Sequence, residues 1–443
     1  MRQTLFYIPE IVFGMPLFGF GLLLALWLVG LFAIGVINAR QHSVANSLTA
    51  LVPYALFGAA VIVFLMPRLA EPIPGSEPLM AGLPVRGYGV LMFFAVTLAV
   101  TLAVYRAAKR GIPADYIYGL AVWLFIAGFA GARMFFVYQY RDQFHTNTWG
   151  EFLGEVVNIA GGGLVVYGSL IGALLAYAAF TWWHKLPPLV FGDIMAPAIL
   201  LGLAIGRIGC LMNGCCYGGP CDYPWAIEFP KSSPPYMAQL NTGLSHGFHL
   251  TRKSEAAANA GDASGGIQIA MVQPASRAAG AGLKAGQVVT AINGKSLTGI
   301  NGATAMRIAT EEIVNTSTGS RLELALDDGS QVAWTGDYVP ERSLPTHPAQ
   351  LYSSLNAFLL CGLILAIAPY QRRDGALLAL TLTIYPVTRF LLEIVRQDEA
   401  AVNRFGFTIS QSVSFGILAV GILLWVFVSR QPREHFQARL DLR

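Results

Sequence analysis

The chain has 443 residues, of which 55% are hydrophobic and only 12% are charged, and its formal net charge is +4. A soluble protein of this length carries about twice that share of charged residues, so the composition indicates a membrane protein. The small net charge argues against a nucleic-acid-binding protein, and we expect no nucleic-acid partner.

Long apolar segments recur along the chain. A membrane-spanning helix needs about 20 mostly apolar residues. Nine segments meet this requirement and predict an all-α polytopic membrane bundle. These segments are 11–37, 45–67, 87–106, 115–139, 161–183, 191–212, 348–369, 375–395 and 408–429.

The distribution of Lys and Arg between the short loops predicts the orientation of the bundle, because cytoplasmic loops are enriched in these residues. An odd number of spans places the two termini on opposite sides of the membrane. One side has eleven basic residues in its short loops and C-terminal tail, and the other side has five. We therefore expect a cytoplasmic C-terminus, with the N-terminus and the long 213–347 loop outside.

The long loop changes in composition after Pro230. Residues 231–261 are rich in Ser, Pro, Ala, Asn and Gly and show no apolar periodicity, so they predict a linker. Residues 262–338 predict a compact α/β domain, in which GGIQIAMV, QVVTAING and RLELALDDG alternate as strands and 302–315 is helical.

This inserted domain resembles a PDZ domain of the bacterial envelope-protease type. The resemblance rests on PASRAA from Pro274, AGLKAGQVV from Ala281 and INGK from Ile292. It implies an envelope protein or peptide as a ligand, because PDZ domains add an extended peptide to a sheet edge. The carboxylate-binding loop is then expected near Gly265 and Gly266. A degenerate domain that acts as a spacer is the alternative.

Charged residues within or at the ends of the apolar segments are the most informative feature. Each buried Arg costs roughly 2.5–3.5 kcal/mol on insertion scales, so it is expected to face a cavity, the bundle interior or a partner. One glutamate cannot neutralise three arginines, and a lipid phosphate would satisfy the others, because guanidinium binds phosphate through two hydrogen bonds. These residues are Arg133, Arg207, Arg389 and Glu393.

Several motifs then resemble the prolipoprotein diacylglyceryl transferase family. They are RGYG from Arg86, GLVVYGSLIG from Gly163, GRIGCLMNG from Gly206, HPAQLY from His347, and the spaced residues Tyr385, Arg389, Glu393 and Arg396. The similarity covers 83–230 and 345–430. It implies a membrane domain in two parts, 81–230 and 345–430, preceded by two extra helices in 1–80 and followed by a cytoplasmic tail at 431–443.

The resemblance implies transfer of a diacylglyceryl group from phosphatidylglycerol to the lipobox cysteine of a prolipoprotein in the bacterial inner membrane. Glycerol phosphate leaves, so the enzyme must stabilise a departing phosphate and a thiolate nucleophile. The resemblance assigns the phosphate to Arg207 and Arg389. It implies lipid-binding roles for Asn213, Gly218, Tyr385 and Tyr88, and supporting roles for Arg133, His347, Gln350 and Glu393.

Three positions depart from the family pattern. Tyr167 stands where the family often has His, and a phenol that titrates near pH 10 is a poor general base. Tyr167 therefore either acts close to an arginine or only donates a hydrogen bond. Cys210 replaces a usual Asn, and Cys215 replaces a later acidic residue. His347 is a spare candidate for the base, with a loop-ordering hydrogen bond as the alternative.

Four cysteines lie between Cys210 and Cys221. A disulfide that joins Cys215 or Cys216 to Cys221 across the Gly-Gly-Pro turn is expected on the external side. Small buried thiols are the alternative. The spacing offers no pair of CxxC motifs for a zinc site, so we expect no metal and no cofactor.

Two other function classes remain open. Intramembrane proteases also combine membrane bundles with PDZ domains, but the chain has no HExxH motif and Ser169 lacks the usual context of a nucleophile. The second alternative is a non-catalytic scaffold or receptor that binds envelope proteins through its PDZ-like domain.

Overall fold

The structure is a computed structural model of the full chain, and it forms two compact units, Met1–Leu91 and Met92–Arg443, which are described separately. It describes residues 4–39, 52, 55–56, 58–73, 76, 80–141, 144, 148–157, 163–252, 266–274, 276–316, 321–335, 341–396 and 407–431.

The first unit begins with strands rather than with a helix. β1 (Thr4–Pro9) pairs antiparallel with β5 (Ala81–Arg86), and β5 also pairs with β4 (Glu71–Pro72). β2 (Ile11–Val12) and β3 (Met15–Pro16) form a tight hairpin.

Helix α1 runs over Leu22–Ala39 and is followed by the π-helix η1 (Val61–Leu65) and the 3-10 helix η2 (Pro67–Leu69). The predicted span 11–37 is therefore wrong at its start. Gly14 turns the hairpin with a φ of 78°, and Pro16 has no amide proton for a helical hydrogen bond.

Seven helices among the described residues are long and apolar enough to cross a membrane. They are α3 (Gly87–Ala108), α4 (Ala114–Gln139), α6 (Val166–Trp183), α7 (Pro188–Asn213), α12 (Ala349–Ile367), α13 (Ala376–Glu393) and α14 (Ile409–Ser429). They match seven of the nine predicted spans. Of the other two, α1 contributes a shorter apolar helix, and 45–67 lies partly outside the described residues. The chain is thus a multi-pass membrane protein.

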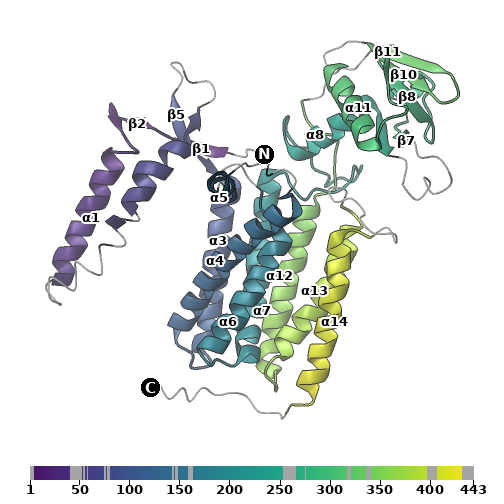
Figure 1. The fold of residues 1–443 in the computed structure, drawn as a ribbon. Coiled ribbons are helices and arrows are strands. Elements are labelled where there is room, and N and C mark those ends of the chain that lie inside the picture. Colours follow the sequence, from purple (N-terminus) through teal and green to yellow (C-terminus); the bar gives the residue numbers. More distant parts are fainter. Residues whose placement is uncertain are drawn as a thin grey trace. The chain divides into compact units, whose positions relative to one another are not determined.

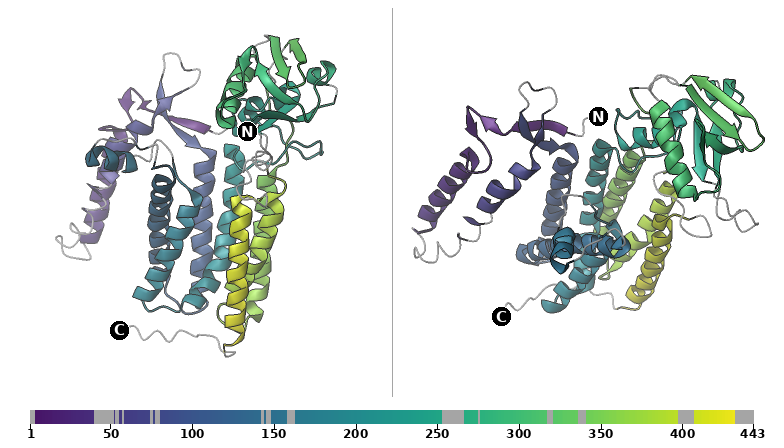
Figure 2. Two further views of the ribbon diagram at one scale, coloured as in Figure 1. Left: turned by 45° about the vertical axis from the view of Figure 1, so that its right-hand side comes forward. Right: turned by 45° about the horizontal axis from the view of Figure 1, so that its top comes forward.

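These helices run side by side as a bundle in both views (Figures 1 and 2). Helices α4 and α6 cross closely because glycines face each other. A Cβ on Gly168 would lie 2.3 Å from the Gly131 carbonyl oxygen, and one on Gly172 would lie 2.2 Å from that of Ala127. Small residues four apart allow such close packing of membrane helices. The GSLIG segment thus has a packing role, and a role for Ser169 as a nucleophile has no support here.

Buried polar residues join α3, α7 and α13 at one end of the bundle. Asp193 is fully buried, and its carboxylate accepts hydrogen bonds from the Gly375 and Leu378 amides at 2.7 and 2.8 Å and from the side chain of Gln371. Arg110 pairs with Asp374 at 2.7 Å and donates to Gln371 at 3.3 Å. We call Arg110, Asp193, Gln371 and Asp374 the aspartate cluster. It caps the start of α13.

The inserted domain is an antiparallel sheet packed against helix α11 (Gly302–Thr316) (Figure 1). The strand order is β11-β10-β8-β7-β6, with β9 beside β8. Its core contains Phe248, Ile269, Ile313 and Leu324. The strands are β6 (Phe248–Arg252), β7 (Ile267–Val272), β8 (Val288–Ile292), β9 (Lys295–Ser296), β10 (Arg321–Leu326) and β11 (Gln331–Thr335), with the short helix α10 (Arg277–Gly280).

One expectation for this region is wrong. The linker predicted at 231–261 contains α8 (Pro234–Asn241), the 3-10 turn η4 (Leu244–His246) and β6, because tertiary pairing orders a polar segment without periodicity; 253–261 lies outside the described residues. The expected carboxylate-binding loop lies partly outside the described residues, since Gly265 is not among them, and it stays a prediction. Strand β7, which follows it, pairs with both β6 and β8. An interior strand has no free edge for a peptide.

The two connections to this domain pair with each other. Isolated bridges join Pro220 and Ile227 to Thr346, and Pro230 to Arg342. The Phe229 amide donates to the Ser343 hydroxyl at 2.8 Å. We call these contacts the clasp. They hold the end of α7 and the start of α12 together independently of the domain between them.

Candidate active site

Charged side chains converge at the end of the bundle where α13 ends and α14 begins. Glu393 is buried, and its carboxylate pairs with Arg389 and, at 3.1 Å, with Arg396. Thr408 donates to the other carboxylate oxygen at 3.4 Å. Arg389 and Glu393 lie four residues apart on α13 and so share one face of the helix. The glutamate is shared with a second guanidinium, so it cannot fully neutralise both.

Tyr167 joins this group through α14. Its hydroxyl lies 3.3 Å from the Ser410 hydroxyl, which accepts a hydrogen bond from Arg389 at 3.1 Å. A chain of polar contacts therefore runs from α6 through α14 to α13. Tyr167 lies near an arginine, as one of its two predicted roles requires.

Arg207 comes from α7 and completes the group. It lies within electrostatic range of Tyr385 on α13, of Arg396, and of the thiols of Cys210 and Cys216. In the part of the chain that the structure describes, no carboxylate pairs with it. We call Arg207, Arg389, Glu393 and Arg396 the arginine site. Arg207 therefore adds a positive charge to this site that no carboxylate of the described residues offsets.

The loop after α7 closes one side of the arginine site. The Gly218 amide donates to the His347 carbonyl at 3.1 Å, and Gly218 bridges to Arg396. A Cβ on Gly218 would lie 2.6 Å from that of His347 and 3.1 Å from the Val395 carbonyl oxygen. Only glycine allows the loop to come this close to both segments.

The other predicted residues near this loop make contacts that hold it against the start of α12. The His347 ring lies 3.4 Å from the Tyr352 hydroxyl, which also accepts from Trp225 at 2.7 Å. Asn213 ends α7, and its side chain bonds to the Cys215 thiol. Gln350 is fully buried and donates to the Cys215 carbonyl at 2.8 Å.

Arg133 has a separate set of main-chain contacts. Arg133 is buried and donates to the main-chain carbonyls of Glu155, Val156 and Gly163 at 2.7, 2.9 and 2.9 Å. It therefore joins α4 to residues 155–156 and to Gly163, which lies four residues before Tyr167. Tyr88 belongs to the first unit, at the start of α3, and is described within that unit only.

Three cysteines gather beside Arg207. The sulfur atoms of Cys210, Cys215 and Cys216 all lie within 4.8 Å of one another. All five cysteines are free thiols, so the expected disulfide to Cys221 is not formed. The neighbouring thiols, and then the guanidinium groups of Arg207 and Arg396, hold the pKa of the Cys216 thiol well below its usual value.

Sequence reasoning missed some members of this end of the bundle. Arg396 was visible as the last residue of a motif, seven positions after Arg389, but was given no role. Ser410 and Thr408 gave no signal, because hydroxyl residues at the start of an apolar helix usually cap it. Thr408 does so here, in a capping box with Gln411.

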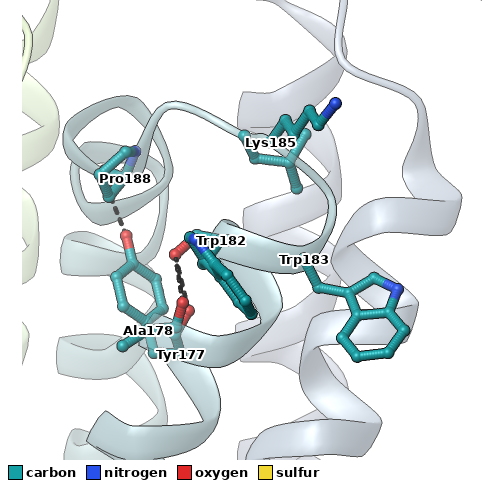
Figure 3. Close-up of a pocket in the computed structure, with 8 residues that line it drawn as sticks. Tyr177, Ala178, Trp182, Trp183, Lys185 and Pro188 are labelled. Atoms are coloured by element: carbon teal, nitrogen blue, oxygen red, sulfur yellow. Dashed lines mark hydrogen bonds between the residues drawn. The ribbon is translucent and has the colours of Figure 1, made fainter.

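A cavity of about 820 Å³ lies at the far end of α6 (Figure 3). It is separated from Tyr167 by about 24 Å, since Trp183 is sixteen residues further along the helix. The exposed Trp182 and Trp183 and the nearby Lys185 are typical of a membrane interface. The lining residues are Tyr177, Ala178, Thr181, Trp182, Trp183, Lys185, Leu186 and Pro188. None of them is a predicted site residue.

Comparison with known proteins identifies relatives of this chain. A curated phosphatidylglycerol–prolipoprotein diacylglyceryl transferase of Rhodopirellula baltica is 32% identical over 96% of this chain and 88% of its own length. That alignment is long enough to include the inserted domain. Relatives with the same name from Thermosynechococcus vestitus and Finegoldia magna are 32% and 36% identical over 39% and 35% of this chain, and 62% of their own length. The model of the prolipoprotein diacylglyceryl transferase family matches residues 78–427, and the chain belongs to that family.

Proposed function

We propose that the chain transfers a diacylglyceryl group from phosphatidylglycerol to the lipobox cysteine thiol of prolipoproteins, the first step of lipoprotein maturation. The observation that supports this most directly is Arg207, which lies in a membrane helix without a carboxylate partner among the described residues. A phosphodiester head group supplies the missing negative charge. Family membership supplies the reaction class.

The arginine site provides what the reaction needs. The substrate sulfur attacks the glyceryl carbon, the carbon–oxygen bond to phosphate breaks, and glycerol phosphate leaves with the electron pair. Negative charge grows on the departing phosphate, and fixed guanidinium groups stabilise it without changing their own protonation. Arg207 and Arg389 take this role, while Glu393 orients Arg389 and Arg396.

The head group would be positioned by the loop after α7 and by α13. Tyr385 lies one turn before Arg389, and Asn213 and Gly218 mark the loop. Gln350 adds a buried Oε1 atom that accepts no hydrogen bond from the described residues. A hydroxyl of the glycerol head group is a suitable donor for it. Tyr88 remains a candidate for lipid contact.

Transfer by purified protein is the direct test. Wild-type protein in detergent, given phosphatidylglycerol and a lipobox peptide, is expected to add a diacylglyceryl mass to the peptide thiol. Arg207→Ala is expected to lower product formation by about 10²–10³-fold. Arg110→Ala, which removes an arginine of the aspartate cluster, is the matched control and should leave the rate per folded molecule unchanged. Wild-type protein that never lipidates the peptide would favour the scaffold role, and cleavage of the peptide would favour a protease.

The orientation and location belong to the same proposal. We place the protein in the bacterial inner membrane, with its C-terminus cytoplasmic and the inserted domain periplasmic, because basic residues favour the loops between α3 and α4 and between α12 and α13. Thiol-labelling of single cysteines placed in these loops in intact cells tests the assignment. Labelling of 372–373 from outside would contradict it.

We also propose that the inserted domain is PDZ-like and that its ligand is an extended segment of an envelope protein. The order of strands and helices in 267–316 supports the resemblance. A peptide would pair with one of the edge strands β6 or β11 and not with β7. The test is peptide binding by the full chain, with a proline substituted at Leu250 in β6 or at Ala333 in β11; loss with neither variant would favour a spacer.

A further inference from the structure

The chain reverses direction at the end of α7 and brings the side chains of three cysteines together. Gly214 follows the helix with a φ of 78°, and the Cys215 amide donates back to the Cys210 carbonyl at 3.2 Å. Cys216 also has a left-handed backbone, with a φ of 60°. This conformation is uncommon for a residue with a side chain and is maintained only where the surroundings impose it. The reversal brings Cys215 and Cys216 over the last turn that contains Cys210.

The resulting geometry is close to that of a thiolate metal site. Zinc–sulfur bonds of about 2.3 Å in a tetrahedron place the sulfur atoms about 3.8 Å apart. The three sulfur atoms already lie within 4.8 Å of one another, so shifts of less than about 1 Å would meet that spacing. No sequence motif indicates this arrangement, because the chain lacks CxxC pairs. The three sulfur atoms are brought together by the turn at Gly214 instead.

The surroundings hold these ligands in place and balance their charge. Gln350 fixes the Cys215 carbonyl at 2.8 Å, and Asn213 bonds to the Cys215 thiol. Three thiolates with one divalent cation leave a net charge of −1. Arg207 and Arg396 interact with this group electrostatically and offset that charge. An anionic metal–thiolate centre is therefore better tolerated here than elsewhere in the bundle.

The number of ligands suggests the use of the site. Structural zinc sites are closed by four protein ligands, whereas sites with three leave one position for water or substrate. Cys221, the next cysteine, is not in the group, and its amide bonds to the Pro345 carbonyl at 3.0 Å. The proposed reaction brings a thiol to this end of the bundle, where Tyr167 is a poor base for it.

We propose that Cys210, Cys215 and Cys216 bind one thiophilic divalent ion of the zinc class and that its open position takes the thiol of the prolipoprotein. The second part rests on the proposed transferase function. On ligation the thiol proton passes to solvent, and the sulfur keeps its electron pair. That pair forms the new carbon–sulfur bond as the carbon–oxygen bond to phosphate breaks, and nothing is oxidised or reduced.

Metal binding is tested first, without reference to activity. Reduced, metal-stripped full-length protein in detergent is titrated with Zn²⁺ and with Co²⁺, whose thiolate charge-transfer absorption reports the ligands. We expect one ion per chain. Cys210→Ser, Cys215→Ser and Cys216→Ser are each expected to weaken binding at least about 100-fold. Cys221→Ser and Cys361→Ser are the matched controls and leave it unchanged. Absence of a stoichiometric ion, or recovery of two of the three cysteines as a disulfide, overturns the site.

The open position has its own test. A lipobox peptide with its cysteine is expected to change the Co²⁺ spectrum, and the same peptide with serine is not. An unchanged spectrum, or a three-coordinate Cu⁺ site without room for a fourth ligand, overturns this part. Transfer that continues at full rate after the metal is removed refutes its role in the reaction and leaves the transferase function standing. Metal binding without any transfer refutes the transferase function and leaves the ion site standing.

Discussion

Helices α7 and α13 have a buried charged group at each end, and the two groups differ in how their charges are balanced. In the aspartate cluster, Arg110 has its own carboxylate in Asp374, and Asp193 receives two amides and a side-chain donor. In the arginine site, Arg389 and Arg396 share Glu393, and Arg207 has no carboxylate among the described residues. The first group has a carboxylate for its arginine, whereas the second has three guanidinium groups and one carboxylate among the described residues.

We therefore expect the aspartate cluster to contribute mainly to stability and the arginine site mainly to the reaction. Buried charges with matched partners hold elements together, and removal of one partner leaves the other exposed to a low dielectric. An unmatched cation costs free energy in the membrane unless it binds something. Variants of the aspartate cluster should therefore change the thermal midpoint, and variants of the arginine site should change the kinetics. Four variants test this comparison.

The largest effect is expected from Asp193→Ala. The substitution leaves the Gly375 and Leu378 amides without their acceptor, and the Gln371 side chain keeps only the Arg373 carbonyl. Breaking a buried charged group of this kind costs about 3–5 kcal/mol. We expect a much lower thermal midpoint in detergent with normal transfer per folded molecule. Asp193→Asn, which keeps one acceptor oxygen, should lose less. An unchanged midpoint for Asp193→Ala would show that this end does not stabilise the bundle.

Arg207→Ala is expected to have the next largest effect, on the reaction rather than on stability. Loss of one preorganised donor to a developing oxyanion lowers kcat by about 10²–10³-fold. The thermal midpoint should not fall, because removal of an unmatched cation relieves repulsion with Arg396. Steady-state kinetics and thermal unfolding of the same preparation test both points. A variant that unfolds more readily and transfers normally would reverse our assignment of the two ends.

Glu393→Gln should alter anion affinity. A neutral side chain no longer offsets Arg389 and Arg396, so inorganic phosphate is expected to inhibit more strongly. Loss of one charge-assisted hydrogen bond should slow transfer about tenfold. Asp374→Asn makes the same charge change in the aspartate cluster and should leave phosphate inhibition unaltered. Equal inhibition of both variants would mean that net charge, and not the local site, governs the effect.

The smallest effect is expected at Tyr167. Tyr167→Phe removes a hydrogen bond to Ser410, and a neutral hydrogen bond contributes about 0.5–1.5 kcal/mol, which corresponds to a few-fold change in rate. Tyr167→His introduces the residue that is common in the family. A loss beyond about 100-fold for Tyr167→Phe would instead assign proton transfer to the phenol, because no simple hydrogen bond of this type is worth so much.

The sequence predicted those parts of the fold that depend on local pattern. The spans from 87 to 429 follow from long apolar runs, and 115–139 and 302–315 coincide almost fully with α4 and α11. The prediction for the start of the chain was wrong, because Gly14 and Pro16 interrupt an apolar run that otherwise resembles a membrane span. Strand β6 was missed because its order comes from pairing with β7 and not from its own composition.

Within the candidate site, charged residues were easier to find than their partners. An arginine in an apolar helix stands out, so Arg207, Arg389 and Glu393 could be named from the sequence. Ser410 could not, since its meaning depends on α14 lying beside α13. Asp193 was overlooked for the same reason, because the amides that it accepts from are more than 180 residues further along the chain. The cysteine group required the backbone reversal at Gly214.

The clasp has a consequence for how such a chain acquires new parts. Pro220, Ile227 and Pro230 reach across to Arg342 and Thr346, so the strands that leave and rejoin the membrane helices are fastened side by side at their base. Whatever lies between these two points closes a loop whose ends are already fixed, and the entropic cost of lengthening such a loop rises only slowly. The clasp is thus a site at which one inserted domain can be replaced by another, because the positions of α7 and α12 relative to each other do not depend on the insert.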